Sequence, residues 1–463
     1  MTLIKSISGI RGTIGGTVGD NLTPLDIARF SSAFGIRIIK YSKAAVPHVV
    51  IGRDARPSGE MVRNIVASSL NALGIDVTDL GLSTTPTVEM AVTNLKADGG
   101  IIITASHNPK NWNALKLLNS KGEFISAEDG AAVLVIAERE EFLFAEVESL
   151  GRYCHDDSQI QKHIEEILAL PLVDADAISR KNFSVVIDCV NSTGGISVPL
   201  MLKALGVNQV TELYCTPDGN FPHNPEPLPE NLTALSAEVK KQKAHLGFSV
   251  DPDVDRLAIV CENGEMFGEE YTLVAVADYV LQTESGATVS NLSSTRALRD
   301  VTGKHAQKYF ASAVGEVNVV AMMKEKNAVI GGEGNGGIIY PKLHYGRDAL
   351  VGIALFLSHL ARSGKSCSAL RKTYPDYFMS KKKIELSPEI MVDEILDALK
   401  TKYSNHEINT VDGIKIDFSQ KSEWVHLRKS NTEPIIRIYA ESTSQSGADS
   451  LAEKIIREIK SLI

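Results

Sequence analysis

A hydroxyl and an imidazole stand side by side in the stretch IIITASHNPKNWNALK, residues 101–116. Its three consecutive isoleucines predict a short buried strand, because β-branched residues favour extended structure. Ser106 and His107 follow this strand, and the next two residues, Asn-Pro, end regular structure. Open α/β sheets bind their ligands at the carboxyl ends of strands. Ser106 is therefore a candidate nucleophile, although Ser-His-Asn-Pro also suits an ordinary capped turn.

Three carboxylates alternate just after the apolar strand in HLGFSVDPDVDRLAIV: Asp251, Asp253 and Asp255. Carboxylates this close repel one another unless a cation lies between them, and hard oxygen ligands select magnesium, manganese or calcium. With Glu262 at the twelfth position the spacing also matches a calcium loop. However, Arg256 replaces the glycine that such a loop requires, and strands are expected on both sides of it. Arg256 would either neutralise the aspartates or clamp a phosphoryl oxygen.

A third candidate loop is GGEGNGG, residues 331–337, which follows the strand-like NAVI. Its glycines let the backbone approach a ligand, and Glu333 and Asn335 can hydrogen-bond hydroxyls or amines. The same stretch also suits a mobile turn. HYGRDAL, residues 344–350, is a candidate to line the same pocket.

Near the end of the chain, LRKSNTEPIIR (residues 427–437) places hydroxyls, an amide and a guanidinium in one turn between two strand-like runs. This combination predicts an anion site, with a solvated Asx/Thr turn as the alternative. The candidate anion ligands are Arg428, Ser430, Asn431 and Thr432. Arg11, in the glycine-rich opening SISGIRGTIGG, could reach an anion in the same way, although such an opening is also typical of a flexible loop.

Length and composition exclude several classes of protein. A chain of 463 residues is too long for one core and predicts about three or four domains. The 48 basic residues against 57 acidic ones argue against nucleic acid as the main partner. No apolar run approaches the ~18 residues of a membrane span, and the first residues lack the apolar core of a signal peptide. With five scattered cysteines that suit free thiols, we expect a cytoplasmic protein.

Strand, helix and strand recur along the chain, which predicts mainly parallel sheets. The unit PHVVIGRDARPSG–EMVRNIVASSLNALG–IDVTDLG returns between residues 183 and 214 and again between 287 and 315. The last section differs, with a helix, a meander of strands and a closing amphipathic helix. The sequence therefore predicts an α/β protein of three tandem α/β domains with mixed, mainly parallel sheets plus a C-terminal α+β domain. We place the domains at residues 1–152, 153–257, 258–370 and 371–463.

Taken together, TASHNP, DPDVDR, GEGNGG and RKSNTEP resemble, in order and along essentially the whole chain, the four active-site loops of the α-D-phosphohexomutase superfamily. The resemblance implies that the four domains surround a central cleft. It also implies an enzyme, an intramolecular phosphotransferase that moves phosphate between C1 and C6 of a hexose through a 1,6-bisphosphate. Its partner would be a small phosphosugar, and we expect a monomer or homodimer.

The same resemblance assigns roles to single residues. Ser106 would be carried as a phosphoserine, and Mg²⁺ would be bound by its phosphate oxygen together with Asp251, Asp253 and Asp255. The residues expected to assist transfer are Arg11, His107, Lys116 and Arg256. Glu333 and Asn335 would hold sugar hydroxyls, and the four residues of the RKSNTEP turn would hold the phosphate that does not react.

This chain departs from the superfamily pattern at three positions. Pro252 stands where a glycine is common, and Asn335 and Gly337 stand where bacterial relatives have serine and histidine. His344 is our candidate replacement for that histidine. GEGNGG is closer to the loop of archaeal-type phosphoglucosamine mutases, which favours glucosamine phosphate as the substrate.

Three other functions compete with this interpretation. The first is a phosphoglucomutase or phosphomannomutase of broad specificity. The second is a phosphomonoesterase, which usually needs a second cluster of His and Asp, whereas the 11 histidines show no HxxxH or paired arrangement. The third is a non-catalytic sugar-phosphate sensor, whose expected loss of the nucleophile or of a metal carboxylate is not seen in the sequence.

Overall fold

The computed structural model describes residues 2–6, 9–385, 392–429 and 435–461. The chain divides into two compact units. Unit 1 comprises Met1–Tyr279 and Asn335–Leu370, and unit 2 comprises Val280–Gly334 and Arg371–Ile463. Within the described ranges, no helix has both the length and the apolar character that crossing a membrane requires.

The first sheet of unit 1 is mixed, with the strand order β1-β2-β6-β5-β3-β4-β7. β3 pairs in parallel with β4 and β5, whereas β6 pairs antiparallel with β5 and β2. The strands are β1 (Ile4–Ser6), β2 (Gly9–Thr13), β3 (His48–Arg53), β4 (Asp76–Leu82), β5 (Gly99–Ile103), β6 (Trp112–Leu118) and β7 (Tyr153–His155).

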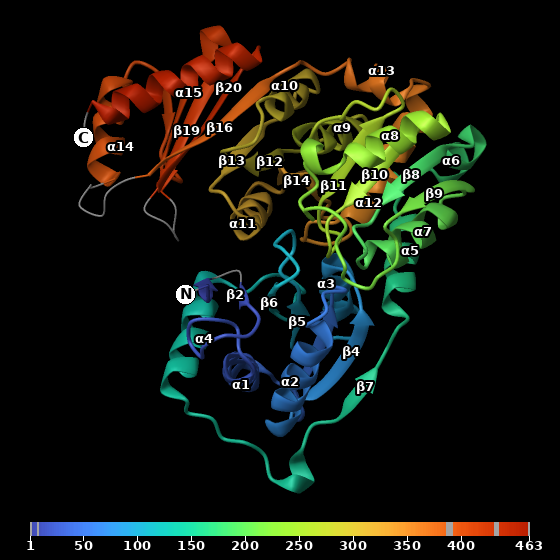
Figure 1. Cartoon of the computed structure of the whole chain (residues 1–463), viewed down its shortest axis with the longest axis vertical. Coiled ribbons are helices and arrows are strands. Elements are labelled where there is room, and N and C mark those ends of the chain that lie inside the picture. Colours follow the sequence, from blue (N-terminus) through green and yellow to red (C-terminus); the bar gives the residue numbers. More distant parts are fainter. Residues whose placement is uncertain (1, 7–8, 386–391, 430–434, 462–463) are drawn as a thin grey trace. The chain divides into compact units, whose positions relative to one another are not determined.

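Both faces of this sheet are covered by helices, as its consecutive apolar residues require. Ile101 and Ile103 pack with residues of α1, α2 and α4 in one core, whereas Ile102 packs with Val88 and Val92 of α3 in another. The helices are α1 (Pro24–Tyr41), α2 (Gly59–Ala72), α3 (Thr85–Asn94) and α4 (Ala127–Arg139) (Figure 1). The strand predicted from the three isoleucines is thus confirmed as fully buried.

The second sheet of unit 1 has the order β11-β10-β8-β9. Its strands are β8 (Ser184–Asp188), β9 (Gln209–Leu213), β10 (Leu246–Val250) and β11 (Leu257–Cys261). β8 pairs in parallel with β9 and β10, and β11 pairs antiparallel with β10. Backbone pairing extends both sheets of unit 1 beyond the boundaries that we drew at residues 152 and 257, because β7 pairs with β4 and β11 with β10.

The other helices of unit 1 pack around the second sheet. They are α5 (Gln159–Leu168), α6 (Ala175–Lys181), α7 (Gly194–Ala204), α8 (Thr233–Gln242), α12 (Ala349–Ser363) and α13 (Cys367–Arg371), with α9 (Glu269–Leu281) leading into unit 2. α12 contacts α5, α6 and α7 and is buried along nearly its whole length. The segment 335–370, which includes β15 (Gly337–Ile339), therefore belongs to the compact unit of the first two domains.

Unit 2 contains a parallel sheet and an antiparallel one. In the parallel sheet, β12 (Thr288–Asn291) lies between β13 (Tyr309–Ser312) and β14 (Ile330–Glu333), with α10 (Ala297–Lys304) and α11 (Glu316–Lys326) packed on it. The antiparallel sheet has the order β16-β20-β19-β18-β17. Its strands are β16 (Phe378–Glu385), β17 (Glu407–Asn409), β18 (Ile414–Phe418), β19 (Glu423–Lys429) and β20 (Ile435–Ser442).

Two helices of unit 2, α14 (Val392–Lys402) and α15 (Gln445–Lys460), share one apolar core with the antiparallel sheet (Figure 1). The predicted meander and closing helix are therefore confirmed. Three short 3-10 helices complete the described elements: Val147–Ser149, Pro229–Asn231 and Ser419–Lys421.

The candidate site residues follow the carboxyl ends of strands. Ser106 comes after β5, the aspartate loop comes after β10, and Glu333 is the last residue of β14. This is the edge at which α/β sheets present their ligand-binding loops. The predicted fold class, α/β domains with mixed sheets and a small α+β domain at the C-terminus, is confirmed.

Candidate active site

Ser106 lies in a tightly held loop directly after β5. Its φ angle of 48° is left-handed, which is uncommon for a residue other than glycine. Its backbone N–H donates to Thr104 Oγ1 at 2.9 Å. Its Oγ donates to Oδ2 of Asp251 at 2.8 Å and lies 3.3 Å from His107 Nδ1. The Ser106 hydroxyl, in the loop after a strand of the first sheet, is therefore in direct contact with the aspartate loop that follows a strand of the second sheet.

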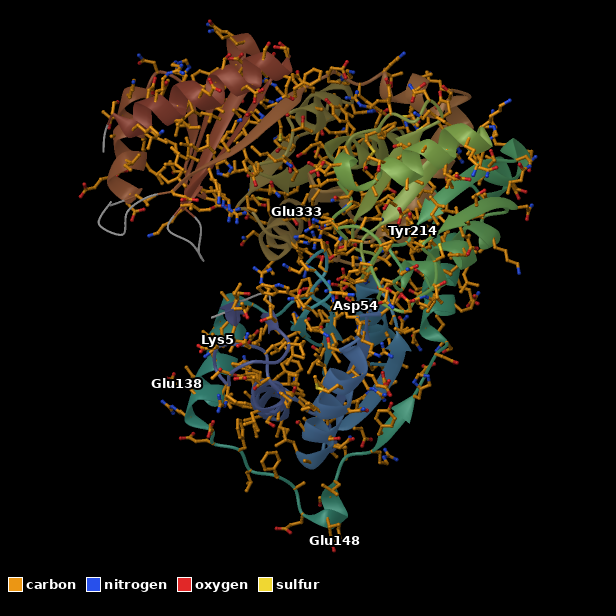
Figure 2. All side chains as sticks on the ribbon, viewed as in Figure 1. Lys5, Asp54, Glu138, Glu148, Tyr214 and Glu333 are labelled. Atoms are coloured by element: carbon orange, nitrogen blue, oxygen red, sulfur yellow. The ribbon has the colours of Figure 1, made fainter. Side chains whose placement is uncertain are left out.

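A buried ion pair holds the serine loop from behind. Arg56 Nε donates to Asp54 Oδ2 at 2.9 Å, and neither side chain has exposed area. The terminal nitrogens of Arg56 donate to the carbonyls of Ser106, Asn108 and Pro109 in the loop and to that of Trp112, the first residue of β6. Thr104 donates to the same oxygen of Asp54 at 2.7 Å. Asp54, labelled in Figure 2, thus connects the end of β3 to the loop after β5.

The three aspartates form one buried group. Asp251, Asp253 and Asp255 have no exposed area, and their carboxylate oxygens include a set that lies within 4.8 Å of one another. Oδ1 of Asp251 accepts from the backbone N–H groups of Asp255 and Arg256, both at 3.1 Å. The predicted grouping of the carboxylates is therefore present in the structure.

Neighbouring elements hold the backbone of the aspartate loop in place. The carbonyl of Pro252 accepts from Ser192 Oγ at 2.7 Å and from Thr193 Oγ1 at 2.8 Å. The carbonyl of Asp253 accepts from the N–H of Thr85 at the start of α3. Val254 is left-handed, with φ at 62°, and its carbonyl accepts from the first residue of α12. Three helix N-termini therefore fix a loop of unusual backbone shape.

Cationic side chains surround the carboxylates. Lys116 Nζ lies 2.7 Å from Asp253 Oδ2 and 3.6 Å from Asp255 Oδ2. Arg347, in the HYGRDAL stretch, donates to Asp255 Oδ2 at 2.7 Å. Arg256 lies 3.4 Å from Glu226 Oε1. Carboxylates and cationic side chains therefore lie together in one buried site. This arrangement suits the binding of an anion together with a metal cation.

The pKa values follow from this crowding. Burial raises the pKa of Asp251 well above its usual range, and the charges of Asp255 and Asp253 raise it further. Burial also acts to raise the pKa of Asp253, but the ammonium of Lys116 outweighs it and lowers that pKa overall. Burial, assisted by Arg256, lowers the pKa of His107 to about 3, so its imidazole is neutral near pH 7.

The aspartates fit a divalent metal ion. Oδ1 of Asp253 and Oδ1 of Asp255 are buried and have no hydrogen-bond partner within the described residues. A buried carboxylate oxygen without a partner is costly, and a cation is one way to satisfy it. Three hard oxygen donors in one place are typical of a Mg²⁺ site.

Two further predicted residues lie on the strands beside this site. Lys116 is on β6, opposite Ile102 of β5. Arg11 is on β2, opposite Ala114 of β6, so it lies on the strand next to that of Lys116. Arg11 is therefore part of a strand rather than of a flexible loop.

The sugar-loop residues lie in different units. In unit 2, Oε1 of Glu333, which is labelled in Figure 2, accepts from Asn291 Nδ2 at 2.9 Å and from the N–H of Gly315 at 3.2 Å. In unit 1, Asn335 Oδ1 accepts from the N–H of Gly337 at 3.2 Å, which closes the turn after the glycines. The carboxylate of Glu333 is therefore fixed by its own unit.

Of the four predicted phosphate ligands, Ser430, Asn431 and Thr432 lie outside the described residues. Arg428 lies near the end of β19, with its Nε 3.7 Å from Asp412 Oδ2. It is paired directly with Arg437 of β20. Like charges directly opposite on neighbouring strands destabilise a sheet, so this pair favours an anion as its partner. We did not select Arg437 from the sequence, although it ends the stretch that we singled out.

His344 has both ring nitrogens engaged within unit 1. Its Nδ1 lies 3.3 Å from Glu89 Oε2, and its Nε2 lies 3.4 Å from Asp348 Oδ2. Burial lowers its pKa, but the hydrogen bonds with Asp348 and Glu89 outweigh burial and raise the pKa to about 10. Its replacement of the superfamily histidine stays a prediction.

Sequence reasoning missed several residues that build the site. Asp54 and Arg56 belong to GRDARPSG, which we interpreted only as a turn after a strand. Arg347 was included in a candidate stretch but given no role. A signal existed for Asp54 and Arg56, because a charged pair that follows an apolar strand at the ligand edge of a sheet indicates more than a solvated turn.

Comparison with known proteins identifies the family along nearly the whole chain. Four family models match in order: the phosphoglucomutase/phosphomannomutase alpha/beta/alpha domains I, II and III and the C-terminal domain of the same family. They match residues 3–144, 161–264, 268–377 and 380–458.

Individual relatives agree with these matches. A phosphoglucomutase/phosphomannomutase of Thermococcus kodakarensis is 36% identical, covering 94% of this chain and 95% of its own. A phosphoglucosamine/phosphogalactosamine mutase of Sulfurisphaera tokodaii is 34% identical, covering 98% of each chain. The crystal structure of a phosphoglucomutase/phosphomannomutase family protein of Burkholderia thailandensis is 26% identical and superimposes with a TM-score of 0.83, covering 99% of this chain and 97% of that one.

The sequence motifs, the four domain matches and the grouping of a serine with three carboxylates all indicate the same family. The relatives bear the names of mutases, which are isomerases that transfer a phosphoryl group within the substrate. The chain belongs to the phosphoglucomutase/phosphomannomutase family of the α-D-phosphohexomutase superfamily and is a phosphohexomutase.

Proposed function

We propose that this enzyme interconverts hexose 6-phosphate and hexose 1-phosphate by way of a phosphoserine at Ser106 and a 1,6-bisphosphate. The observation that carries the proposal is the contact of Ser106 Oγ with Asp251 Oδ2, at 2.8 Å, within a group of three carboxylates. A hydroxyl in such surroundings is in position to carry a phosphoryl group, provided that cations neutralise it.

Phosphorylation would change this contact in a specific way. The Ser106 hydroxyl donates a hydrogen bond to Asp251, whereas the oxygen that bears the phosphoryl group in a phosphoserine has no hydrogen to donate. A phosphoserine and an ionised Asp251 would be two anions in one buried site, which is strongly unfavourable without a cation. The geometry of Ser106 and Asp251 therefore supports a metal and a phosphoserine together.

Two phosphoryl transfers in opposite directions convert the substrate and restore the enzyme. The phosphoryl group leaves Ser106 Oγ and bonds to the free hydroxyl oxygen of a hexose monophosphate, and Oγ receives the proton which that hydroxyl loses. After the bisphosphate turns around, Ser106 Oγ accepts the other phosphoryl group, and the sugar oxygen that it leaves takes up the proton. The enzyme regains its phosphoserine, and the product is the isomeric monophosphate.

We infer that Asp251, Asp253 and Asp255 hold Mg²⁺, because two of their buried oxygens lack a hydrogen-bond partner among the described residues. When bound, this ion supplies positive charge for the phosphoryl oxygens. Lys116 and Arg256 would neutralise the remaining charge, and the neutral imidazole of His107 would hydrogen-bond at Ser106. Arg347 would keep Asp255 oriented toward the metal.

The remaining predicted residues would bind the sugar and its second phosphate. Glu333 is fixed by Asn291 and Gly315, so its carboxylate is pre-organised for a hydroxyl or amine. Arg428 and Arg437 present two guanidinium groups from neighbouring strands, which suits the phosphate that does not react. Ser430, Asn431 and Thr432 would complete that phosphate site.

Glucosamine phosphate is our proposed substrate. The GEGNGG loop and the name of the Sulfurisphaera relative favour it. The second candidate is a broad phosphoglucomutase/phosphomannomutase, which the name of the Thermococcus relative favours. The mannose, glucose and glucosamine phosphates differ at C2, so specificity depends on which groups face that carbon.

A substrate panel distinguishes the candidates. kcat/KM is measured for glucosamine 1- and 6-phosphate, glucose 1-phosphate and mannose 1-phosphate, with Mg²⁺ and a trace of the cognate 1,6-bisphosphate. A tenfold preference, about 1.4 kcal/mol in the transition state, assigns the substrate. We expect glucosamine phosphate to be preferred, whereas equal values would indicate the broad enzyme.

Two controls test the mechanism in the same assay. Ser106→Ala is expected to abolish turnover with the fold retained, because a loop hydroxyl contributes little to the core. Removal of divalent ions with a chelator is expected to stop turnover until Mg²⁺ is restored. Turnover that survives either treatment would contradict the proposed chemistry.

We also infer that the enzyme works in the cytoplasm, on a small phosphosugar. None of the five cysteines, which all lie in the described ranges, is in a disulfide. This state suits a reducing compartment.

A further inference from the structure

A second cluster of metal-ligating side chains lies in unit 1, outside the phosphoryl-transfer site. It contains His163 of α5, His344 of the HYGRDAL stretch and Asp348, the N-cap of α12. His163 and Asp348 are buried at 1% and 0% exposure, and the side chain of His344 is 12% exposed. Two imidazoles and a carboxylate brought together from distant parts of the chain are a known ligand set for transition metals.

One atom of each side chain faces a common centre. His163 Nε2 lies 2.9 Å from Asp348 Oδ2, and His344 Nε2 lies 3.4 Å from the same oxygen. All three ligand atoms lie within 4.8 Å of one another. Tetrahedral zinc holds its N and O ligands at ~2.0–2.2 Å, which places those atoms about 3.3 Å apart. The observed spacing needs only small adjustments to admit such an ion.

The other polar atom of each ligand lies close to an outer neighbour. His163 Nδ1 is 2.9 Å from Thr87 Oγ1, and His344 Nδ1 is 3.3 Å from Glu89 Oε2. Oδ1 of Asp348 accepts from the first N–H groups of α12, at 2.8 and 3.2 Å. Metal-bound histidines usually donate their second N–H to a hydroxyl, carbonyl or carboxylate, which fixes the ring and directs the free nitrogen at the metal.

We propose that His163, His344 and Asp348 bind a zinc-class divalent ion, with water as a further ligand. The ion would balance the charges of Asp348 and Glu89 and would join α3, α5 and the start of α12. Imidazole nitrogens favour Zn²⁺ or Co²⁺ over Mg²⁺, whereas the aspartate group of the active site consists of hard oxygens. The two sites therefore differ in the metal that they select, and this proposal does not depend on the phosphoserine.

Cobalt binding tests the site directly. The whole chain is freed of metals, supplied with excess Mg²⁺ to occupy oxygen sites, and titrated with Co²⁺ while its visible absorption is recorded. Nitrogen-ligated Co²⁺ of low coordination number absorbs far more strongly than six-coordinate Co²⁺ in oxygen ligands. We expect one strongly absorbing Co²⁺ per chain, released by Zn²⁺, and the same stoichiometry of bound Zn²⁺ by elemental analysis.

The variants His163→Gln and His344→Gln are expected to lose this absorption, and exposed His155→Gln is the matched control that keeps it. If a cluster variant fails to fold, the wild-type melting temperature decides, since Zn²⁺ should raise it in excess Mg²⁺. Absence of the absorption in the folded wild type would overturn the proposal and leave an ionic hydrogen-bonded cluster. Equal absorption in folded His163→Gln would overturn it too, because the ion would then be bound elsewhere.

Discussion

Ser106 Oγ donates a hydrogen bond to Oδ2 of Asp251 over 2.8 Å, although the two residues lie 145 positions apart in the chain. This contact joins the loop after β5 to the loop after β10. Each loop is held by its own supports, Arg56 behind the serine and Ser192, Thr193 and Thr85 around the aspartates. Because the supports fix the backbone, the hydroxyl and the carboxylate meet without further adjustment, as pre-organised catalysis requires.

Arg56 is expected to act as a positioning residue. Arg56→Lys removes the planar fork that holds the loop carbonyls, and it leaves Asp54 with a poorer partner. We expect kcat to fall by about 100-fold, since small displacements of a reacting group are costly. We also expect the free energy of unfolding to fall by roughly 3 kcal/mol.

The control for Arg56 is Arg152→Lys. Arg152 also pairs with an aspartate, Asp76, but its side chain is 86% exposed. We expect this variant to match the wild type in steady-state kinetics and urea unfolding. Equal effects of the two substitutions would show that the serine loop does not depend on Arg56.

Removal of the Lys116 charge is expected to raise the affinity for Mg²⁺ and to lower turnover. Its ammonium is 2.7 Å from Asp253 Oδ2 and partly neutralises the carboxylates. Lys116→Met keeps the length of the side chain and removes the charge, so Mg²⁺ should bind more tightly to the more negative group. Turnover should nevertheless fall by at least ~100-fold, because a cation at the phosphoryl group is lost.

Calorimetric Mg²⁺ titration and steady-state kinetics of Lys116→Met check the two effects together. Weaker Mg²⁺ binding would mean that Lys116 organises the carboxylates instead of competing with the metal. Unchanged turnover would remove Lys116 from the transfer step.

Arg428 is expected to bind substrate without touching the reacting atoms. It faces Arg437 on the next strand, and two guanidinium groups so placed favour an anion between them. Arg428→Ala should raise KM by about 10- to 100-fold with a smaller change in kcat, because one charge-assisted hydrogen-bonding group to the substrate is lost. Arg437→Ala should act similarly, and a fall in kcat alone would contradict the assignment.

Unit 2 is expected to lose stability in mild acid through His426. Burial lowers the pKa of His426 to about 4, and its ring contacts Ser293 Oγ at 2.9 Å and the carbonyl of Asp412. The unfolded chain takes up the proton near pH 6.5 while the folded chain does not. The stabilising contribution is therefore complete above about pH 6.5 and is lost as pH falls toward 4, by about 2 kcal/mol at pH 5.

The chain offers a clean reporter for this loss. It has two tryptophans, and Trp424 lies on β19, the strand that also carries His426. Urea unfolding followed by Trp424 fluorescence in a Trp112→Phe background, at about pH 7.5 and about pH 5, measures the difference. In His426→Gln the pH dependence should shrink by that amount. An equal dependence in both proteins would assign it to other groups.

Several features of the fold were predictable from local pattern. The run Ile101–Ile103 predicted β5, the alternating aspartates predicted a carboxylate group at the end of β10, and the three strand-like runs near the C-terminus predicted the antiparallel meander. These features depend on residues close together in the sequence, where periodicity and turn chemistry are informative.

Contacts between distant segments were not predictable in the same way. Arg347 contacts Asp255 across 92 positions, and His163 contacts Asp348 across 185. Neither contact leaves a local pattern, because the residue spacing within one segment does not reveal its partner in the other. The pairing of β7 with β4 and of β11 with β10 was not predictable either, since the residues of β7 and β11 do not reveal their pairing partners.

If Ser106 carries the phosphoryl group that the enzyme transfers, it must gain and lose that group at least as fast as the enzyme turns over. The most direct test incubates the enzyme with the cognate hexose 1,6-bisphosphate, maps the phosphorylated peptide by mass spectrometry, and then adds unlabelled hexose 6-phosphate in a single turnover. We predict one phosphoryl group on Ser106, and its loss to the sugar at a rate no slower than kcat. Full turnover by an enzyme whose Ser106 stays unmodified, or whose phosphoryl group leaves more slowly than kcat, would contradict the account.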